Sequence, residues 1–214
     1  MSTTTGRFRV YRVFGAVPHI NLRDAETDTL YTVYQSGYAD QDAVDALRTG
    51  DLIEATLSGD PTDDDEPWRI EDHEPCGGVT TDFVVDEPMP EAARTHWHEG
   101  DTQPRFVALG EEEPVGVCAI QPRETLPRGA FVPNVLTGLL PLEELFQSPP
   151  IIDGPAAEVV FVDADPPDAD RYTKPYGVAL VFGEAGRELA DRYREEYDLP
   201  RGEDSRPDYD PYGI

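Results

Sequence analysis

The sequence predicts an α+β protein with a β-rich first half and a smaller second half of mixed strands and helices. Five short runs rich in β-forming residues occupy positions 6–75, with one helical segment between the third and the fourth run. In positions 104–199 strand-like runs alternate with helical segments, and the last of these is an amphipathic helix at 184–197. The chain of 214 residues has room for two small domains, and its 10 Tyr, 8 Phe and 2 Trp supply enough aromatic surface for their cores.

The first half opens with three strands, followed by a short helix and two further strands. Alternation of apolar and polar residues identifies the strands, and polar or acidic turns separate them. Asp40 is the expected N-cap of the helix, and Thr49 with Gly50 ends it. The five strands are expected at positions 7–14, 18–23, 30–35, 51–57 and 67–72.

This order of elements is similar to that of the oligonucleotide/oligosaccharide-binding (OB) fold, in which a helix sits between strands three and four of a five-stranded barrel. The phrase Thr-Gly-Asp-Leu-Ile-Glu-Ala at 49–55 resembles the usual entry into strand four of that fold. The resemblance covers positions 6–75 and implies a five-stranded OB-like β-barrel. Other five-stranded barrels share this order and remain an alternative.

The second half is expected to be a small α+β domain at 104–199. Positions 76–103 are expected to be a linker and the start of this domain, with a short strand at 82–85 and a helix within 90–99. The acidic tail 200–214 has no periodicity, so it is expected to be disordered unless a partner orders it. The remaining elements are strands at 105–110, 115–122, 158–163 and 177–182 and an apolar stretch at 134–146.

Charge is the strongest compositional signal. Asp and Glu number 44 against 17 Lys and Arg, which gives a net charge of −27 spread over every segment, and Lys174 is the only lysine among the cations. This composition resembles that of cytoplasmic proteins of halophilic archaea, because a hydrated carboxylate surface stays soluble where molar salt shortens the screening length to about 3 Å. Screening also removes much of the repulsion between an acidic protein and a nucleic acid. The whole layout is similar to haloarchaeal families that join an OB-like front to a small α+β back, and that resemblance implies no biochemical role.

Location and reaction class are bounded by what the sequence lacks. It has no signal-peptide pattern, and Cys76 and Cys118 cannot make a disulfide framework, so a cytoplasmic protein is expected. No stretch is long and apolar enough for a membrane helix, so no membrane partner is expected. Phosphate-loop, dinucleotide-binding, serine-hydrolase and His-Glu-x-x-His motifs are absent from the sequence, which favours a protein that is not an enzyme.

Four residues of the zinc-binding types lie within 26 positions. They are His73, Cys76, His96 and His98, and they include three of the four histidines. Zinc prefers such nitrogen and sulfur ligands, so the cluster predicts a metal site for a small zinc-dependent hydrolase. The spacing differs from that of a standard zinc finger, and solvated histidines near a helix end are the alternative.

Arginine and tyrosine residues on the expected barrel strands predict a nucleic-acid-binding face. OB folds stack bases on aromatic rings while cations follow the phosphates. The alternative is that some of these tyrosines belong to the core. The acidic loop at 63–66 would repel a phosphate and so counts against nucleic-acid binding. The predicted binding residues are Arg7, Arg9 and Tyr11 on the first strand and Tyr31, Tyr34 and Tyr38 on or just beyond the third.

Lys174 is a further candidate contact because it stands between Tyr172 and Tyr176 in a chain where every other cation is arginine. A compact ammonium offers three freely rotating donors, which a planar guanidinium does not. We therefore expect a phosphate contact or a buried amine at this position, or else an ordinary exposed cation.

These observations favour a non-catalytic nucleic-acid-associated factor. RNA or a ribonucleoprotein such as the ribosome is the first expected partner, and single-stranded DNA is the second. One alternative is the zinc-dependent hydrolase. Another is a protein–protein adaptor in which the barrel and the tail at 209–214 dock on a larger assembly.

Overall fold

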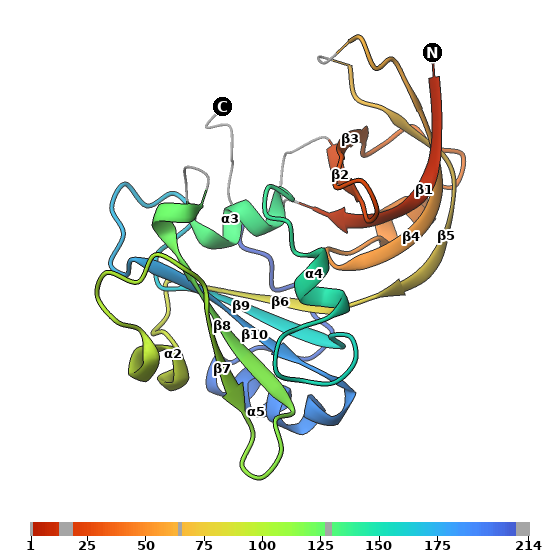
Figure 1. Ribbon diagram of the computed structural model, residues 1–214. Helices are drawn as coiled ribbons and strands as arrows, with labels where there is room; N and C mark the ends of the chain where they lie inside the picture. The colour runs from red at the N-terminus through yellow and green to blue at the C-terminus, as the bar shows by residue number, and fades with distance from the viewer. Residues whose placement is uncertain (1, 13–18, 64–65, 127–129, 209–214) are drawn as a thin grey trace.

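The computed structural model describes residues 2–12, 19–63, 66–126 and 130–208 and contains two five-stranded sheets with few helices (Figure 1). The predicted α+β class is confirmed. None of the described helices has the length and apolar character needed to span a membrane.

The first sheet is antiparallel and carries the N-terminal half of the chain. Its strands are in the order β3-β2-β1-β4-β5, and helix α1 (Gln41–Ala46) follows β3. Asp40 caps this helix as predicted, because its carboxylate accepts a hydrogen bond from the amide of Ala43 at 3.1 Å. The strands are β1 (Ser2–Tyr11), β2 (His19–Asp24), β3 (Leu30–Tyr34), β4 (Asp51–Gly59) and β5 (Arg69–Gly78).

Strand β1 begins five residues before the predicted start at position 7. Residues 2–6 pair with the end of β4, from Ser2 opposite Gly59 to Gly6 opposite Ala55. Their run of serine and threonine is mostly exposed and lacks the apolar alternation on which the prediction relied. Positions 13–14 of this predicted strand and position 18 of the next lie outside the described residues.

The two edge strands of the first sheet come together at Trp68. Val33 of β3 forms a parallel bridge with Trp68, which directly precedes β5. The amide of Tyr34 donates to the Trp68 carbonyl at 3.0 Å, and the amide of Trp68 donates to the Thr32 carbonyl at 2.8 Å. The apolar side chains of the five strands, with Val44 and Leu47 from the α1 segment, form one core inside this sheet.

The second sheet is mixed, with the strand order β6-β9-β10-β8-β7, and only β6 and β9 run parallel. Strands β9 and β10 are buried along their whole length because helices cover both faces of the sheet. The strands are β6 (Thr80–Val85), β7 (Arg105–Leu109), β8 (Gly116–Pro122), β9 (Glu158–Asp163) and β10 (Tyr176–Phe182). The helices are α2 (Glu91–His96), α3 (Phe131–Leu136), α4 (Glu143–Gln147) and α5 (Arg187–Glu196), with 3₁₀ turns η1 (Arg123–Thr125) and η2 (Glu184–Gly186).

The helices divide into two layers around the second sheet (Figure 1). Helices α3 and α4 lie between the two sheets, and their side chains share a core with Tyr11 from β1. Helices α2 and α5 cover the opposite face, where Ala93 and Ala190 pack against the strands. The final predicted helix at 184–197 is divided, because η2 precedes α5.

The expected linker at 76–103 is not a separate connection. Strand β5 continues to Gly78 and β6 begins at Thr80, so Val79 alone joins the two sheets. The amide of Val79 donates to the Gly50 carbonyl at 3.0 Å, which fastens this one-residue connection to the first sheet.

Residues 200–208, which were expected to be disordered, make polar contacts with both halves of the chain. Arg201 reaches Glu158 on β9 at 3.0 Å, and Ser205 accepts a hydrogen bond from the amide of Phe83 at 2.9 Å. Arg206 donates to the Arg12 carbonyl at 3.3 Å. Polar anchors of this kind leave no apolar periodicity in a sequence, so the pattern of this segment does not reveal them. Residues 209–214 lie outside the described part of the chain.

Candidate functional site

Arg9, a predicted nucleic-acid contact, is instead part of the joint between the two sheets. Its guanidinium donates to both carboxylate oxygens of Glu143 on α4, at 3.0 and 2.7 Å, and to the Gly50 carbonyl at 2.7 Å. The guanidinium also lies over the ring of Phe146, 5.1 Å from its centroid. Burial raises the pKa of Glu143, but the hydrogen bonds from Arg9 and Gln147 outweigh burial and hold that pKa below its usual value. The side chain of Arg9 is therefore occupied by contacts within the protein.

Tyr11 is covered by the same joint and is 1% exposed. Its ring packs within the core formed by α3 and α4, and Gly138 approaches it so closely that an added Cβ would lie 2.9 Å from the ring. Burial raises the pKa of the Tyr11 hydroxyl. This tyrosine cannot stack on a nucleic acid unless the two sheets separate.

Neighbouring β2 residues extend the joint. The side-chain amide of Asn21 donates to the Thr137 carbonyl at 2.8 Å, and Arg23 donates to the Gly138 carbonyl. The outward face of β1 and β2 thus lies against the turn between α3 and α4. Sequence reasoning missed this role because strand alternation identifies an outward face but not what covers it.

Arg7 is the residue of the predicted β1 face that stays open. Its side chain is 46% exposed and lies 3.7 Å from Glu26. It lines a cavity of about 1070 Å³ between the sheets, together with Phe146 and Arg187. Several carboxylates, including Glu113 and Glu184, share this cavity, so it has no uniformly basic wall.

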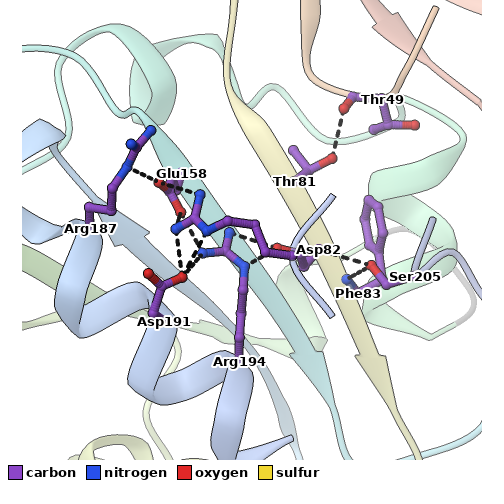
Figure 2. Close-up of polar contacts among 10 residues, drawn as sticks. Thr49, Thr81, Asp82, Phe83, Glu158, Arg187, Asp191, Arg194 and Ser205 are labelled. Carbon is purple, nitrogen blue, oxygen red and sulfur yellow. Dashed lines mark hydrogen bonds and ion pairs between the residues drawn. The ribbon is translucent and has the colours of Figure 1, made fainter. Parts of the chain in front are cut away.

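Figure 2 shows a buried ion network, and two of its members, Glu158 and Arg187, also line this cavity. Arg194 of α5 donates to Asp82 of β6 at 2.8 Å and to Glu158 of β9 at 2.5 Å, and all three side chains are 3–4% exposed. Arg187 reaches Glu158 from the solvent side at 3.3 Å, and Asp191 lies 3.3 Å from Arg194. The network joins three elements, so we read it as structural support for the joint rather than as an open site.

The end of the first sheet away from this joint carries an aromatic groove of about 820 Å³. Tyr31 and Trp68 line it, with ring centroids 5.1 Å apart in an edge-to-face arrangement, and both side chains are half-buried. Tyr31 also packs edge-on against Phe8 of the core. His19 lies in the same groove, and burial lowers its pKa, which favours the neutral ring.

Carboxylates border the same groove. Asp60, Asp63 and Glu66 belong to its lining and to the loop between β4 and β5. Residues 64–65 of the acidic loop lie outside the described part of the chain. A phosphate entering the groove would meet these carboxylates, and salt would weaken the repulsion.

Tyr34 and Tyr38 lie around one cation, Arg69. The Arg69 guanidinium is 5.4 Å from the Tyr34 ring centroid and 5.3 Å from that of Tyr38. It also donates to the Gly37 carbonyl at 2.7 Å, and the Tyr38 hydroxyl donates to the Tyr34 carbonyl at 2.6 Å. Burial raises the pKa of Tyr38. Sequence reasoning missed both Trp68 and Arg69, although an adjacent aromatic residue and cation at the end of an acidic loop were visible signals.

Lys174 is exposed and lies just before β10, beside the second sheet. Its carbonyl accepts a hydrogen bond from Arg123 at 2.8 Å, and the Arg123 guanidinium lies 4.0 Å from the centroid of the Tyr172 ring. Arg123 is paired in turn with Asp163 and Asp165. The turn is held by its backbone, and the ammonium is not the buried amine considered from the sequence.

The four predicted zinc ligands do not form a cluster. His73 and Cys76 lie on β5 of the first sheet, whereas His96 ends α2 beside the second sheet and His98 follows it. The imidazole Nδ1 of His96 is 2.8 Å from the Ala92 carbonyl, and the Cys76 thiol is 3.4 Å from the Leu52 carbonyl. Within residues 2–12, 19–63, 66–126 and 130–208, no three His, Cys, Asp or Glu side chains form a group that could hold a metal ion.

The two thiols differ in environment. Burial raises the pKa of Cys118 to about 12, so this thiol stays protonated in the core. Partial burial and the charge of Glu54 raise the pKa of the exposed Cys76. Neither environment activates a thiolate nucleophile.

Comparison with known proteins adds no relative. No protein-family model matches the chain, and none of the curated proteins is similar to it. The aromatic groove and the cation held between Tyr34 and Tyr38 are the features of the first sheet that could bind a ligand.

Proposed function

We propose that the first sheet is an OB-like barrel and that the protein is a non-catalytic factor that binds single-stranded nucleic acid. The strand order, the helix between β3 and β4, and the parallel bridge from Val33 to Trp68 support the barrel. RNA or a ribonucleoprotein is the first partner and single-stranded DNA the second, in the cytoplasm of a halophilic archaeon.

The observation that carries this proposal is the pair of half-buried rings, Tyr31 and Trp68, in the groove formed by β2, β3 and the loop after β4. Bases stack on aromatic faces without regard to sequence, at about 1–3 kcal/mol per base. Arg69 directly follows Trp68 but does not line the groove, so its guanidinium, held between the Tyr34 and Tyr38 rings, would meet only the phosphates of a strand that continues past Trp68. Because Asp60, Asp63 and Glu66 oppose those phosphates, binding is expected to depend on stacking and to persist at molar salt.

The intrinsic fluorescence of Trp68 provides the test. The chain has two tryptophans, and Trp97 packs against Tyr176 beside the second sheet, with ring centroids 4.7 Å apart. The variant Trp97→Phe keeps an aromatic contact there and leaves Trp68 as the sole reporter. We expect oligouridine and oligothymidine to quench its emission at molar KCl.

Two further variants identify the site of binding. Tyr31→Ala in the reporter background should weaken binding by about 1–3 kcal/mol, the value of one lost stack. Tyr172→Ala removes a 42% exposed ring beside the second sheet and should leave binding unchanged. If neither oligonucleotide quenches Trp68 at any KCl concentration from dilute to molar, the nucleic-acid proposal is wrong.

A further inference from the structure

A second groove, of about 580 Å³, lies on the second sheet and is independent of the aromatic groove. Phe106, Ala119 and Ala179 form part of it and lie opposite one another across the neighbouring strands β7, β8 and β10. Helix α3 packs on β6, β9 and β10. The groove lies over β7 and β8, where Phe106 is exposed and Ala119 is buried at its floor, and the buried Leu140 and Leu142 with the half-buried Leu145 form the wall toward the helices.

The edge of the sheet lies beside this groove. Strand β7 is the last in the order β6-β9-β10-β8-β7, and within the described part of the chain it pairs only with β8. Phe106 on this strand is 41% exposed. A large exposed apolar side chain on an edge strand favours pairing with another chain. Arg105, the charged residue of this strand, is neutralised by Asp101 at 2.8 Å. The edge thus combines available backbone groups with an apolar surface.

The charge around the groove indicates which kind of partner it binds. Glu144 is the one charged residue among its described lining residues, and it is exposed. Strand β7 of a second copy would bring Arg105 as its one cation, and Arg105 is already paired with Asp101 at 2.8 Å, so a second copy matches Glu144 poorly. An apolar segment that carries a lysine or arginine matches both the lining and the charge.

We propose that β7 and this groove bind an extended apolar segment of another protein, which adds a strand to the sheet and places a basic residue near Glu144. In strand addition the backbone hydrogen bonds supply affinity, and pockets for alternate side chains supply specificity. Phe106 and the leucine wall would take every second side chain of the segment.

Selection from a library of random peptides displayed on phage tests the proposal at molar KCl. We expect the full-length protein to enrich peptides that alternate apolar and polar residues and that carry a lysine or arginine. Phe106→Asp should weaken binding of a synthetic copy of the best peptide at least tenfold. The matched control Leu139→Asp places the same charge at a 49% exposed leucine outside the groove lining and should change binding less than twofold.

Backbone pairing and charge are tested separately. Two versions of the peptide are N-methylated at every second amide, one at the odd positions and one at the even positions. One version should lose binding because its methyl groups block the amides that pair with β7, and the other should bind like the parent. Glu144→Gln should weaken the binding of the basic peptide but not the binding of its uncharged counterpart. The proposal is overturned if no peptide is enriched on the wild type over Phe106→Asp, or if both N-methylated peptides bind like the parent. Binding of a small apolar dye without any peptide would reassign the groove to a small molecule.

Discussion

Replacing Arg194 by leucine should destabilise the fold more than any surface arginine does. Arg194, Asp82 and Glu158 are each 3–4% exposed, so the substitution leaves two buried carboxylates without their shared cation. Removing one partner from a buried ion pair costs about 3–5 kcal/mol. In a chain of 214 residues each kcal/mol lowers the melting temperature by about 2–4 °C, so the expected loss is about 6–20 °C.

Arg187→Leu is the matched control, because it removes a second arginine of α5 that contacts the same carboxylate. The side chain of Arg187 is 66% exposed, and an exposed pair contributes about 0–1 kcal/mol. Thermal unfolding followed by circular dichroism at molar KCl measures both variants, since a buried pair is screened far less than an exposed one. Equal melting temperatures for Arg194→Leu and Arg187→Leu would refute the reasoning.

Comparison of the wild type with Arg194→Leu also predicts how stability changes with pH. Burial raises the pKa of Glu158, but hydrogen bonds from Arg201 and Arg194 outweigh burial, so its folded-state pKa lies below the unfolded value. The stability that this carboxylate contributes is therefore present above the unfolded pKa of about 4.3 and is lost as pH falls through the lower folded value. Because Arg194→Leu removes one lowering contact, its acid unfolding should begin at a higher pH than that of the wild type. An unchanged acid midpoint in an acid titration of the far-ultraviolet signal would contradict this.

Three further predictions concern the joint and the surface. Arg9→Ala should lower stability by about 3 kcal/mol through the Glu143 pair, while the folded variant binds oligonucleotides like the wild type; weakened binding at full stability would contradict this. Gly138→Ala should lower the free energy of unfolding in urea by about 1–3 kcal/mol more than Gly154→Ala does. Both glycines have positive φ, but only at Gly138 would the added Cβ meet the Tyr11 ring. Equal losses for the two variants would refute that contact. The melting temperature should rise steeply with KCl because of the net charge of −27, and a midpoint that is the same in dilute and molar KCl would remove the halophile interpretation.

Local patterns were sufficient to predict most elements of the fold. Alternation located strands of the first sheet, short apolar runs located the central strands of the second sheet, and the Asp40 cap located α1, because backbone geometry acts over a few neighbouring residues. The strand–strand–strand–helix–strand–strand order of the first half was also readable, because it depends only on the succession of such patterns. The polar start of β1 was missed because its pairing with β4 leaves no apolar period.

The candidate site was predicted only in part. Tyr31 contacts Trp68, whereas Tyr34 and Tyr38 contact Arg69, and both partners arrive through the pairing that joins β3 to the start of β5. That proximity spans more than thirty positions of sequence. A strand period specifies which side chains share a face and does not specify which distant strand will lie next to it.

The charge, the α+β class and the positions of most strands follow from composition and from short-range periodicity, so they are readable without a structure. Tertiary structure alone decided the roles of individual cations. Arg7 and Arg9 share one face of β1, yet Arg7 stays exposed while Arg9 is buried against Glu143, a residue 134 positions away. Burial of a charge requires a partner brought in by packing, and the free energy of that packing depends on the whole chain rather than on the residues adjacent in sequence.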